Sequence, residues 1–257
     1  MSTALIEEHL RALKMPAALA HYRRLAETAK DPIAYLGEVL STELERRHEN
    51  GVKQRIAAAH LPTLKTLETF DFTLQPNIPK MKILRLVDGA FIRDRRNIVL
   101  YGPPGTGKTH CLIAIGLAAC TLGYRTLFTT AAGLLTTLLD AKRDGTLTRK
   151  LQAIDRFSLL LVDELGYIPF EREATDLLFQ VISQRYERGS IAMTTNLAFE
   201  QWTQIFPDAM AARAVIDRLI DHGSVFEFTG ESHRLRRRQA NAAKGCNTDR
   251  TTQRSSG

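Results

Sequence analysis

The residues with the clearest chemical meaning form a glycine-rich segment directly after the apolar run 98–101. The segment consists of Gly102, Pro103, Pro104, Gly105, Thr106, Gly107, Lys108 and Thr109. In this G-x-x-x-x-G-K-T pattern the glycines let backbone N–H groups point at phosphates, the lysine neutralises phosphate charge and the threonine hydroxyl binds Mg²⁺. A turn that only joins a strand to a helix would need neither the lysine nor the hydroxyl. The segment therefore predicts a site for a nucleoside triphosphate and Mg²⁺.

A pair of carboxylates, Asp163 and Glu164, ends a second apolar run at residues 157–162. Acids on a buried strand must be solvated or bound to a partner. We expect Asp163 to hold the metal together with Thr109, and Glu164 to orient and deprotonate an attacking water. The alternative is a strand that simply emerges into solvent with acids at its tip.

Two further polar residues follow apolar or helical segments. Asn196 comes after the run 191–195, where it either contacts the γ-phosphate or the attacking water at the end of a parallel strand or caps the next helix. The sequence leaves both open. Arg218 lies in the helical segment 211–219, far from the phosphate loop along the chain, and most arginines in helices have no catalytic role.

A parallel sheet must bring these residues together. After residue 61, apolar β-type runs alternate with helical patterns, which is typical of a parallel sheet covered on both faces. We expect strands at 97–101, 124–129, 158–162, 191–195 and 225–228, and helices at 109–122, 133–142, 174–187 and 210–221. The fold class is therefore α/β.

The first sixty residues read differently, because they contain little Gly or Pro and their apolar spacing is helical. Pro16 and Asp31-Pro32 divide this stretch, and Asp31 is expected to cap the helix that starts at Pro32. We predict a helical domain at 1–60 for DNA or partner binding, an ATPase domain at 61–235 and a basic tail at 236–257.

The net charge of +7 over 257 residues is concentrated at the C-terminal end, where residues 232–257 hold seven basic residues and one acid. This tail either touches phosphates or keeps the protein dispersed in water. In the helical stretch, acids alternate with bases, so the following cations either form a solvated face or contact DNA: Arg23, Arg24, Arg46, Arg47, Lys53 and Arg55. The segment 142–150 offers either DNA phosphate contacts or an exposed helix–turn–helix surface, with Lys142, Arg143, Arg149 and Lys150.

Other features limit where the chain works. The apolar stretches are interrupted before the roughly 20 residues that span a bilayer, and no export leader is expected at the start. The three cysteines form no pair with metal-ligand spacing. We therefore predict that Cys111 and Cys120 are core residues whose thiols stay reduced. From these features we expect a cytoplasmic protein without membrane partners.

Several motifs together resemble those of the IstB family of AAA+ ATPases, which assist insertion-sequence transposases and are related to the DnaC helicase loaders. The likeness runs from about Leu5 to Leu235. It rests on the phosphate loop, residues 161–167 (Leu-Val-Asp-Glu-Leu-Gly-Tyr), 194–196 (Thr-Thr-Asn), 214–219 (Ala-Val-Ile-Asp-Arg-Leu) and 230–235 (Gly-Glu-Ser-His-Arg-Leu). The chain departs from the family pattern at Thr195, where Ser is usual, and at His233, where Tyr is frequent.

The resemblance implies an AAA+ core with a five-stranded parallel sheet behind an all-helical N-terminal domain, and hydrolysis of ATP with Mg²⁺. It further implies a homo-oligomer with ATP at its subunit interfaces, double-stranded DNA bound with little sequence preference, and a transposase partner. In that scheme Asn196 is the sensor 1 residue and Arg218 is an arginine finger for a neighbouring subunit. Arg234 is a candidate C-terminal sensor, and Phe70 and Phe72 are candidates for the adenine wall.

Three alternatives remain at this stage. A loader of a replicative helicase would use the same ATP chemistry with a different partner. A metabolic kinase would need an acceptor pocket and an arginine-rich lid, and Glu164 beside Asp163 suits water as the acceptor. A nucleotide-dependent scaffold would bind ATP with negligible turnover.

Overall fold

The structure, a computed structural model, describes residues 3–29, 31–166, 171–204, 206, 209–233 and 236. Arg234 and the predicted tail beyond Arg236 lie outside the described residues. The chain divides into two compact units, Met1–Gln54 and Arg55–Gly257. The predicted domain boundary at residue 60 falls a few residues after this division. The two units are described separately below.

Three helices build the first unit: α1 (Thr3–Ala12), α2 (Pro16–Thr28) and α3 (Pro32–Ala58), the last of which continues past the division. Ala18, Tyr22 and Val39 form its small buried core. The Asp31 side chain accepts a hydrogen bond from the N–H of Ala34 at 2.8 Å, as a helix cap does. The predicted cap at the start of α3 is therefore confirmed.

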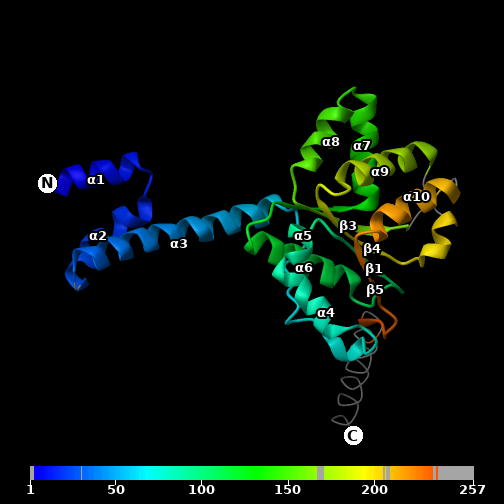
Figure 1. Cartoon of the computed structure of the whole chain (residues 1–257), viewed down its shortest axis with the longest axis horizontal. Coiled ribbons are helices and arrows are strands. Elements are labelled where there is room, and N and C mark those ends of the chain that lie inside the picture. The colour runs from blue at the N-terminus through cyan, green and yellow to red at the C-terminus, as the bar shows by residue number, and fades with distance from the viewer. Residues whose placement is uncertain are drawn as a thin grey trace, which may run out of the picture. The chain divides into compact units, whose positions relative to one another are not determined.

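A five-stranded parallel sheet organises the second unit (Figure 1). The strands lie in the order β2-β3-β4-β1-β5, and each neighbouring pair is parallel. Their bounds are β1 (Asn97–Tyr101), β2 (Thr126–Thr130), β3 (Leu159–Leu165), β4 (Ser190–Thr195) and β5 (Gly223–Glu227). The strand before the phosphate loop thus lies inside the sheet, between β4 and β5.

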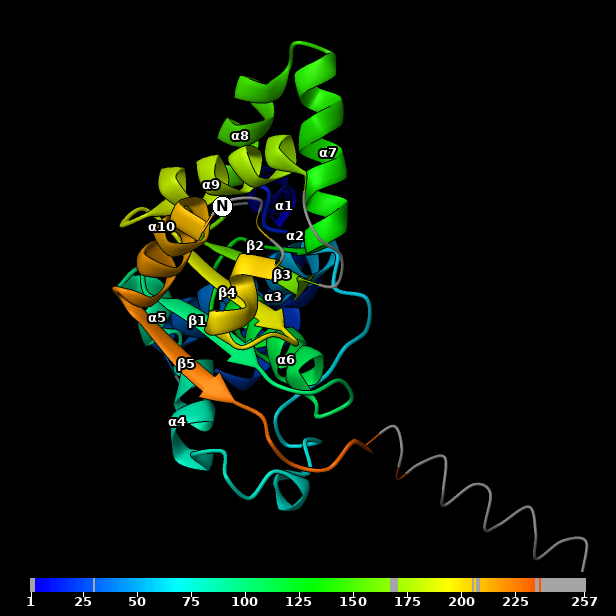
Figure 2. The ribbon, with the colours of Figure 1, turned by 90° about the vertical axis from the view of Figure 1, so that its right-hand side faces the viewer.

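Helices cover both faces of this sheet. They are α4 (Lys80–Arg85), α5 (Ala90–Arg93), α6 (Lys108–Thr121), α7 (Ala131–Arg143), α8 (Leu147–Asp155), α9 (Arg172–Arg185) and α10 (Ala209–Ile220), with short 3-10 turns η1 (Phe72–Leu74), η2 (Leu86–Asp88) and η3 (Phe199–Gln204). Figures 1 and 2 place α7 to α10 on one side of the sheet and α4 to α6 on the other. Adjacent residues of β1 enter different cores, since Val99 packs with the first set and Ile98 and Leu100 with the second. This two-sided burial explains the continuous apolar runs of the strands.

The predicted strands and helices are present, with shifted ends. The second strand starts at Thr126 instead of residue 124, and β3 continues through the acid pair to Leu165 instead of ending at residue 162. The helices expected from the sequence did not include α8. In the structure α7, the turn at Gly145 and α8 form the helix–turn–helix surface that was one of the two interpretations of residues 142–150.

None of the helices in the described residues combines the length and hydrophobicity of a bilayer-spanning segment.

Candidate nucleotide-binding site

The phosphate loop, residues 102–109, joins the carboxyl end of β1 to the first turn of α6. Two of its glycines are required by the space around them. A Cβ on Gly102 would lie 2.1 Å from the carbonyl oxygen of Phe228, and a Cβ on Gly107 would lie 2.5 Å from the Phe70 ring. Both glycines also have positive φ, +136° and +99°, which other residues rarely adopt. The loop can therefore curl so that the N-terminus of α6 faces the pocket, where it favours an anion.

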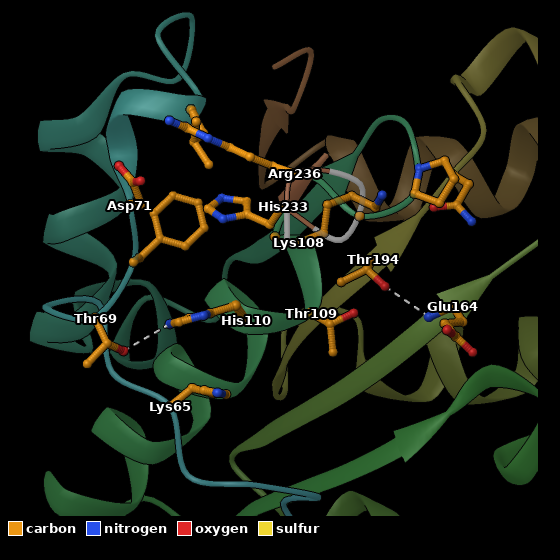
Figure 3. Close-up of a pocket in the computed structure, with 16 residues that line it drawn as sticks. Lys65, Thr69, Asp71, Lys108, Thr109, His110, Glu164, Thr194, His233 and Arg236 are labelled. Atoms are coloured by element: carbon orange, nitrogen blue, oxygen red, sulfur yellow. Dashed lines mark hydrogen bonds between the residues drawn. The ribbon is translucent and has the colours of Figure 1, made fainter. Parts of the chain in front are cut away.

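Lys108 brings positive charge to a pocket of about 790 Å³ at the carboxyl edge of the sheet (Figure 3). This volume lies in the range of roughly 300–1,000 Å³ that small-molecule sites occupy. The Lys108 side chain is buried. Its Nζ donates to the carbonyl oxygens of Gly102 at 2.6 Å and Pro103 at 2.7 Å. The ammonium group therefore lies within the loop that is predicted to hold the phosphates.

Asp163 lies beside the loop, as the sequence predicted. Its Oδ1 accepts hydrogen bonds from the hydroxyls of Thr109 at 2.9 Å and Thr194 at 2.5 Å. A threonine hydroxyl and one carboxylate fit a Mg²⁺ ion that takes its other oxygens from phosphate and water. No group of three or more His, Cys, Asp or Glu side chains in the described part of the chain could hold a metal by itself. The donor set therefore suits a metal that arrives with a phosphate.

Glu164 differs from its neighbour because its side chain is exposed and lines the pocket. Its backbone has φ +62°, in the left-handed region. Its N–H donates to the Thr194 hydroxyl at 2.9 Å, as the dashed line in Figure 3 marks. The carboxylate is accordingly on the solvent side of the site, where a water can approach.

Asn196 also lines this pocket, together with Thr194 and residues of the loop. The following backbone N–H groups of Leu197 and Ala198 donate to the side chains of Thr195 and Gln201, each at 3.1 Å. The start of the next turn therefore has partners other than Asn196. This placement fits the phosphate-facing hypothesis better than the capping one, and the role of Asn196 stays a prediction.

An aromatic wall closes the other side of the pocket. Phe70 lines it, and its ring centroid lies 5.4 Å from that of His110 and 5.9 Å from that of His233. Phe72, the second candidate for the adenine wall, packs on Phe70 at 4.7 Å and does not line the pocket. The 3-10 turn that begins at Phe72 directs its ring onto Phe70. Of the two candidates only Phe70 lines the pocket in the described residues, and its role as the adenine wall stays a prediction.

Two histidines connect distant segments to this wall. His110 Nε2 lies 2.8 Å from the carbonyl oxygen of Thr66, so Nε2 carries the hydrogen. Burial lowers the pKa of His110, which favours the neutral ring. The backbone N–H of His233 donates to the carbonyl oxygen of Gly105 at 3.0 Å. The segment after β5 is thereby tied to the phosphate loop.

Arg218 lies elsewhere. Its guanidinium is 4.6 Å from the ring centroid of Phe179 and donates to the carbonyl oxygen of Ala214 at 3.1 Å. It lines a surface hollow with Tyr186 and Asp221, whereas other residues line the nucleotide pocket. Within one copy of the chain, the structure does not bring Arg218 to the phosphate loop.

The cations predicted to contact DNA fall into two groups. Most have partners within the chain: Arg23 pairs with Glu7, Arg46 with Glu49, Arg47 with Glu43, Arg55 with the carbonyl oxygen of Cys120, Lys142 with Glu173 and Arg143 with Asp140. The others, Arg24, Lys53, Arg149 and Lys150, are exposed. Arg55 in particular joins α3 to α6, so its first role is structural. Ion pairs at the surface do not exclude contact with DNA, so a DNA role for all of these cations stays a prediction.

Sequence reasoning overlooked several pocket residues. Lys65, Thr69, His110, Thr194 and Arg236 all line the pocket. A signal existed for His110, which follows Lys108-Thr109 on the first turn of α6, and for Thr194, two residues before Asn196. The positions of Lys65, Thr69 and Arg236 depend on how segments distant in sequence cross the loop, which no local pattern indicates.

Comparisons with known proteins agree with this geometry. Residues 6–241 match the family described as IstB-like ATP binding protein. The chain is 40% identical to an ATP-binding protein of the insertion sequence IS21 from Pseudomonas aeruginosa over 238 residues, which are 91% of this chain and 90% of that protein. It is 37% identical to an ATP-binding protein of the insertion sequence IS5376 from Geobacillus stearothermophilus over 243 residues, 93% of this chain and 97% of that protein.

Solved structures resemble the chain in fold. DnaA from Aquifex aeolicus bound to AMPPCP has a TM-score of 0.55 and 21% identity, and the match covers 66% of this chain and 51% of that one. DnaI has a TM-score of 0.52 and 21% identity, and the match covers 65% of this chain and 89% of that one. At such identity the likeness concerns the fold alone, a parallel sheet covered by helices.

Proposed function

This chain belongs to the family of IstB-like ATP-binding proteins, and from that premise we infer that it hydrolyses ATP while assembled on double-stranded DNA and so assists a transposase. The observation that carries the catalytic part is the meeting of Lys108, Thr109, Asp163, Glu164 and Asn196 at one pocket. The insertion-sequence setting of its relatives supports the transposase as partner.

Each pocket residue has a distinct part in hydrolysis to ADP and phosphate. The loop N–H groups and Lys108 bind the phosphates, and Thr109 and Asp163 would hold Mg²⁺, which neutralises charge on the phosphate oxygens when bound. Glu164, on the solvent side, orients and deprotonates the attacking water. Asn196 fixes that water or the γ-phosphate. The base fits beside Phe70, whose ring also lies near that of His233.

Assembly would complete the site. Arg218 is partly buried on α10 and lines a hollow that is separate from the nucleotide pocket of the same chain. If Arg218 takes part in hydrolysis, it therefore acts on ATP bound to a second copy of the chain. An arginine that reaches the phosphates of a neighbour stabilises transition-state charge and couples hydrolysis to oligomerisation. DNA would bind through exposed cations such as Arg149 and Lys150, and phosphate contacts of this kind are tolerant of sequence.

The first experiment measures ATP turnover by the full chain with Mg²⁺, with and without long duplex DNA. We expect turnover that DNA increases, and a drop of about 10²-fold or more in the variant Glu164→Gln. That variant should still bind ATP and form long-lived DNA complexes. The matched variant Glu231→Gln changes an exposed glutamate that does not line the pocket and should keep turnover. Normal turnover in Glu164→Gln would remove Glu164 from the mechanism.

A mixing experiment tests the trans role of Arg218. Arg218→Ala and Lys108→Ala should each be inactive alone, and their mixture should partly recover hydrolysis because an intact pocket can meet an intact arginine. Arg213→Ala, an exposed position on the same helix, is the control and should retain activity. Absence of recovery at every mixing ratio would count against the proposed geometry.

A helicase loader remains the alternative with the same chemistry. Affinity purification with ATP and DNA separates the two: recovery of a transposase supports the proposal, and recovery of a replicative helicase supports the alternative.

A further inference from the structure

The pairing of β3 with β4 is irregular beside the acid pair. Val162 pairs with Met193 and Leu165 pairs with Thr195. Two residues of β3, Asp163 and Glu164, therefore lie opposite one residue of β4, Thr194. Such bulges are rare between parallel strands and are found preferentially next to active sites.

The bulge changes the directions in which the side chains of Asp163 and Glu164 point. Consecutive side chains of a regular strand point to opposite faces of the sheet, so a regular β3 would aim Asp163 and Glu164 in opposite directions. Here Asp163 is buried against Thr109, while Glu164 turns into the pocket. The turn occurs at Glu164 itself, whose φ of +62° is seldom adopted by residues other than glycine. Some interaction must hold this backbone in place.

The Thr194 hydroxyl contacts both acids. It donates to Asp163 Oδ1 at 2.5 Å and accepts from the N–H of Glu164 at 2.9 Å. Thr194 is 2% exposed, so water does not readily replace either bond. Because one hydroxyl serves as donor and acceptor at once, its position fixes the carboxylate of one acid and the backbone of the other. Figure 3 shows Thr194 between Thr109 and Glu164.

We propose that Thr194 is the positioning residue for the acid pair: its hydroxyl maintains the bulge that sends Asp163 to the metal position and Glu164 to the attacking water. The inference rests on the proposed ATP hydrolysis. Loss of the hydroxyl leaves the Glu164 N–H without its partner and removes a donor from Asp163. The partners of the hydroxyl are the two acids, so the chemical step should suffer more than ATP binding.

The test compares Thr194→Val, which keeps the shape and removes the hydroxyl, with Thr194→Ser, which keeps the hydroxyl. In the full chain with Mg²⁺ and duplex DNA, we expect the kcat of Thr194→Val to fall about 10-fold or more. Its KM for ATP and its affinity for a fluorescent ATP analogue should change less than about 3-fold. Thr194→Ser should stay within about 3-fold of the wild type in kcat.

Thr126→Val is the matched control, because Thr126 is also a 2% exposed strand threonine but lies at the amino end of β2. It should leave kcat unchanged. Unaltered kcat in Thr194→Val, equal losses of kcat and ATP affinity, or failure of Thr194→Ser to restore turnover would each overturn the inference.

An activity-independent measurement separates this inference from the proposed function. Hydrogen exchange of the Glu164 amide, followed by NMR, should be faster in Thr194→Val than in the wild type and Thr194→Ser. A wild-type protein without ATP turnover would contradict the proposed hydrolysis. The exchange rates of the Glu164 amide would still show whether Thr194 holds the bulge. Equal exchange in all three proteins would overturn it.

Discussion

Two buried carboxylates, one in each unit, have opposite surroundings. Glu43 on α3 is 4% exposed and Asp163 on β3 is 5% exposed. Glu43 accepts from the backbone N–H groups of Ala17 and Ala18 at 3.0 and 3.1 Å, and from Arg47 at 2.9 Å. Asp163 accepts from two side-chain hydroxyls, Thr109 and Thr194, beside an open pocket.

The difference separates an acid whose charge is compensated within the fold from one that is accessible to a ligand. Glu43 is bonded to the first turn of α2 and to a guanidinium, so its charge is compensated within the protein. Three of the roughly four acceptor sites of its carboxylate are already used by these partners. The Thr109 hydroxyl can rotate toward a cation that enters through the pocket, while Thr194 keeps its bond to the carboxylate. Burial of an acid alone therefore does not indicate a site, and the nature of its donors does.

The largest expected effect comes from Lys108→Ala, which tests whether the pocket beside Asp163 binds ATP. We expect ATP affinity to fall about 10²-fold or more, because the charge-assisted contact with the phosphates is lost. Lys82→Ala, an exposed lysine on α4, should bind ATP normally. Titration with a fluorescent ATP analogue gives both values. Undiminished affinity in Lys108→Ala would mean that the pocket beside Asp163 is not the nucleotide site.

Asp163→Asn tests the functional acid directly. Removal of the metal-binding charge should lower kcat about 10²-fold and raise the Mg²⁺ concentration needed for half-maximal rate. ATPase rates across a Mg²⁺ titration measure both. Glu43→Gln is the counterpart in the helical unit and should leave the Mg²⁺ dependence as it is. An equal change of the Mg²⁺ dependence in both variants would contradict a role in metal binding that is specific to Asp163.

Glu43→Ala tests the structural acid. Two backbone N–H groups would lose their partner, so we expect the helical unit to lose about 1–3 kcal/mol of stability. Urea unfolding followed by circular dichroism measures the loss, and Glu45→Ala, exposed on the same helix, should stay within about 0.5 kcal/mol. A loss as small as that of the control would contradict the structural role.

The same acid predicts a pH dependence. Burial opposes its ionisation, but the hydrogen bonds from Arg47, Ala18 and Ala17 outweigh this and lower the pKa of Glu43 below its ordinary 4.5. A carboxyl with a lowered folded pKa stabilises the fold above its unfolded pKa and loses that contribution as the pH falls through the folded value. The difference between the wild type and Glu43→Ala should therefore shrink below about pH 4.5.

The smallest expected effect concerns the exposed cations of α8. Arg149→Gln combined with Lys150→Gln should weaken duplex DNA binding uniformly across sequences. It should also reduce the slope of log affinity against log salt by roughly 1.8, about 0.9 for each lost phosphate contact. ATP affinity should not change, since neither residue lines the pocket. An unchanged salt slope would place the DNA contacts elsewhere.

Much of the site follows from local sequence. Glycines at 102 and 107 occupy backbone conformations that their spacing to Lys108 predicts, and Asp31 caps α3 as its place before Pro32 indicates. The run of apolar residues before Asp163 correctly indicates a buried strand. Its end was wrong by three residues, because the chain continues as a strand beyond the acids only where β4 supplies Thr194 opposite them.

The sequence by itself thus determined the phosphate loop, the alternation of strands and helices, and the acid pair, since each depends on residues that are neighbours along the chain. Only the tertiary structure decided the bulge at Glu164, the aromatic wall at Phe70 and the distance of Arg218 from its own pocket. Those features depend on the register between strands and on the packing of distant segments. Both are set by the shape and burial of the whole sheet, which local spacing does not encode.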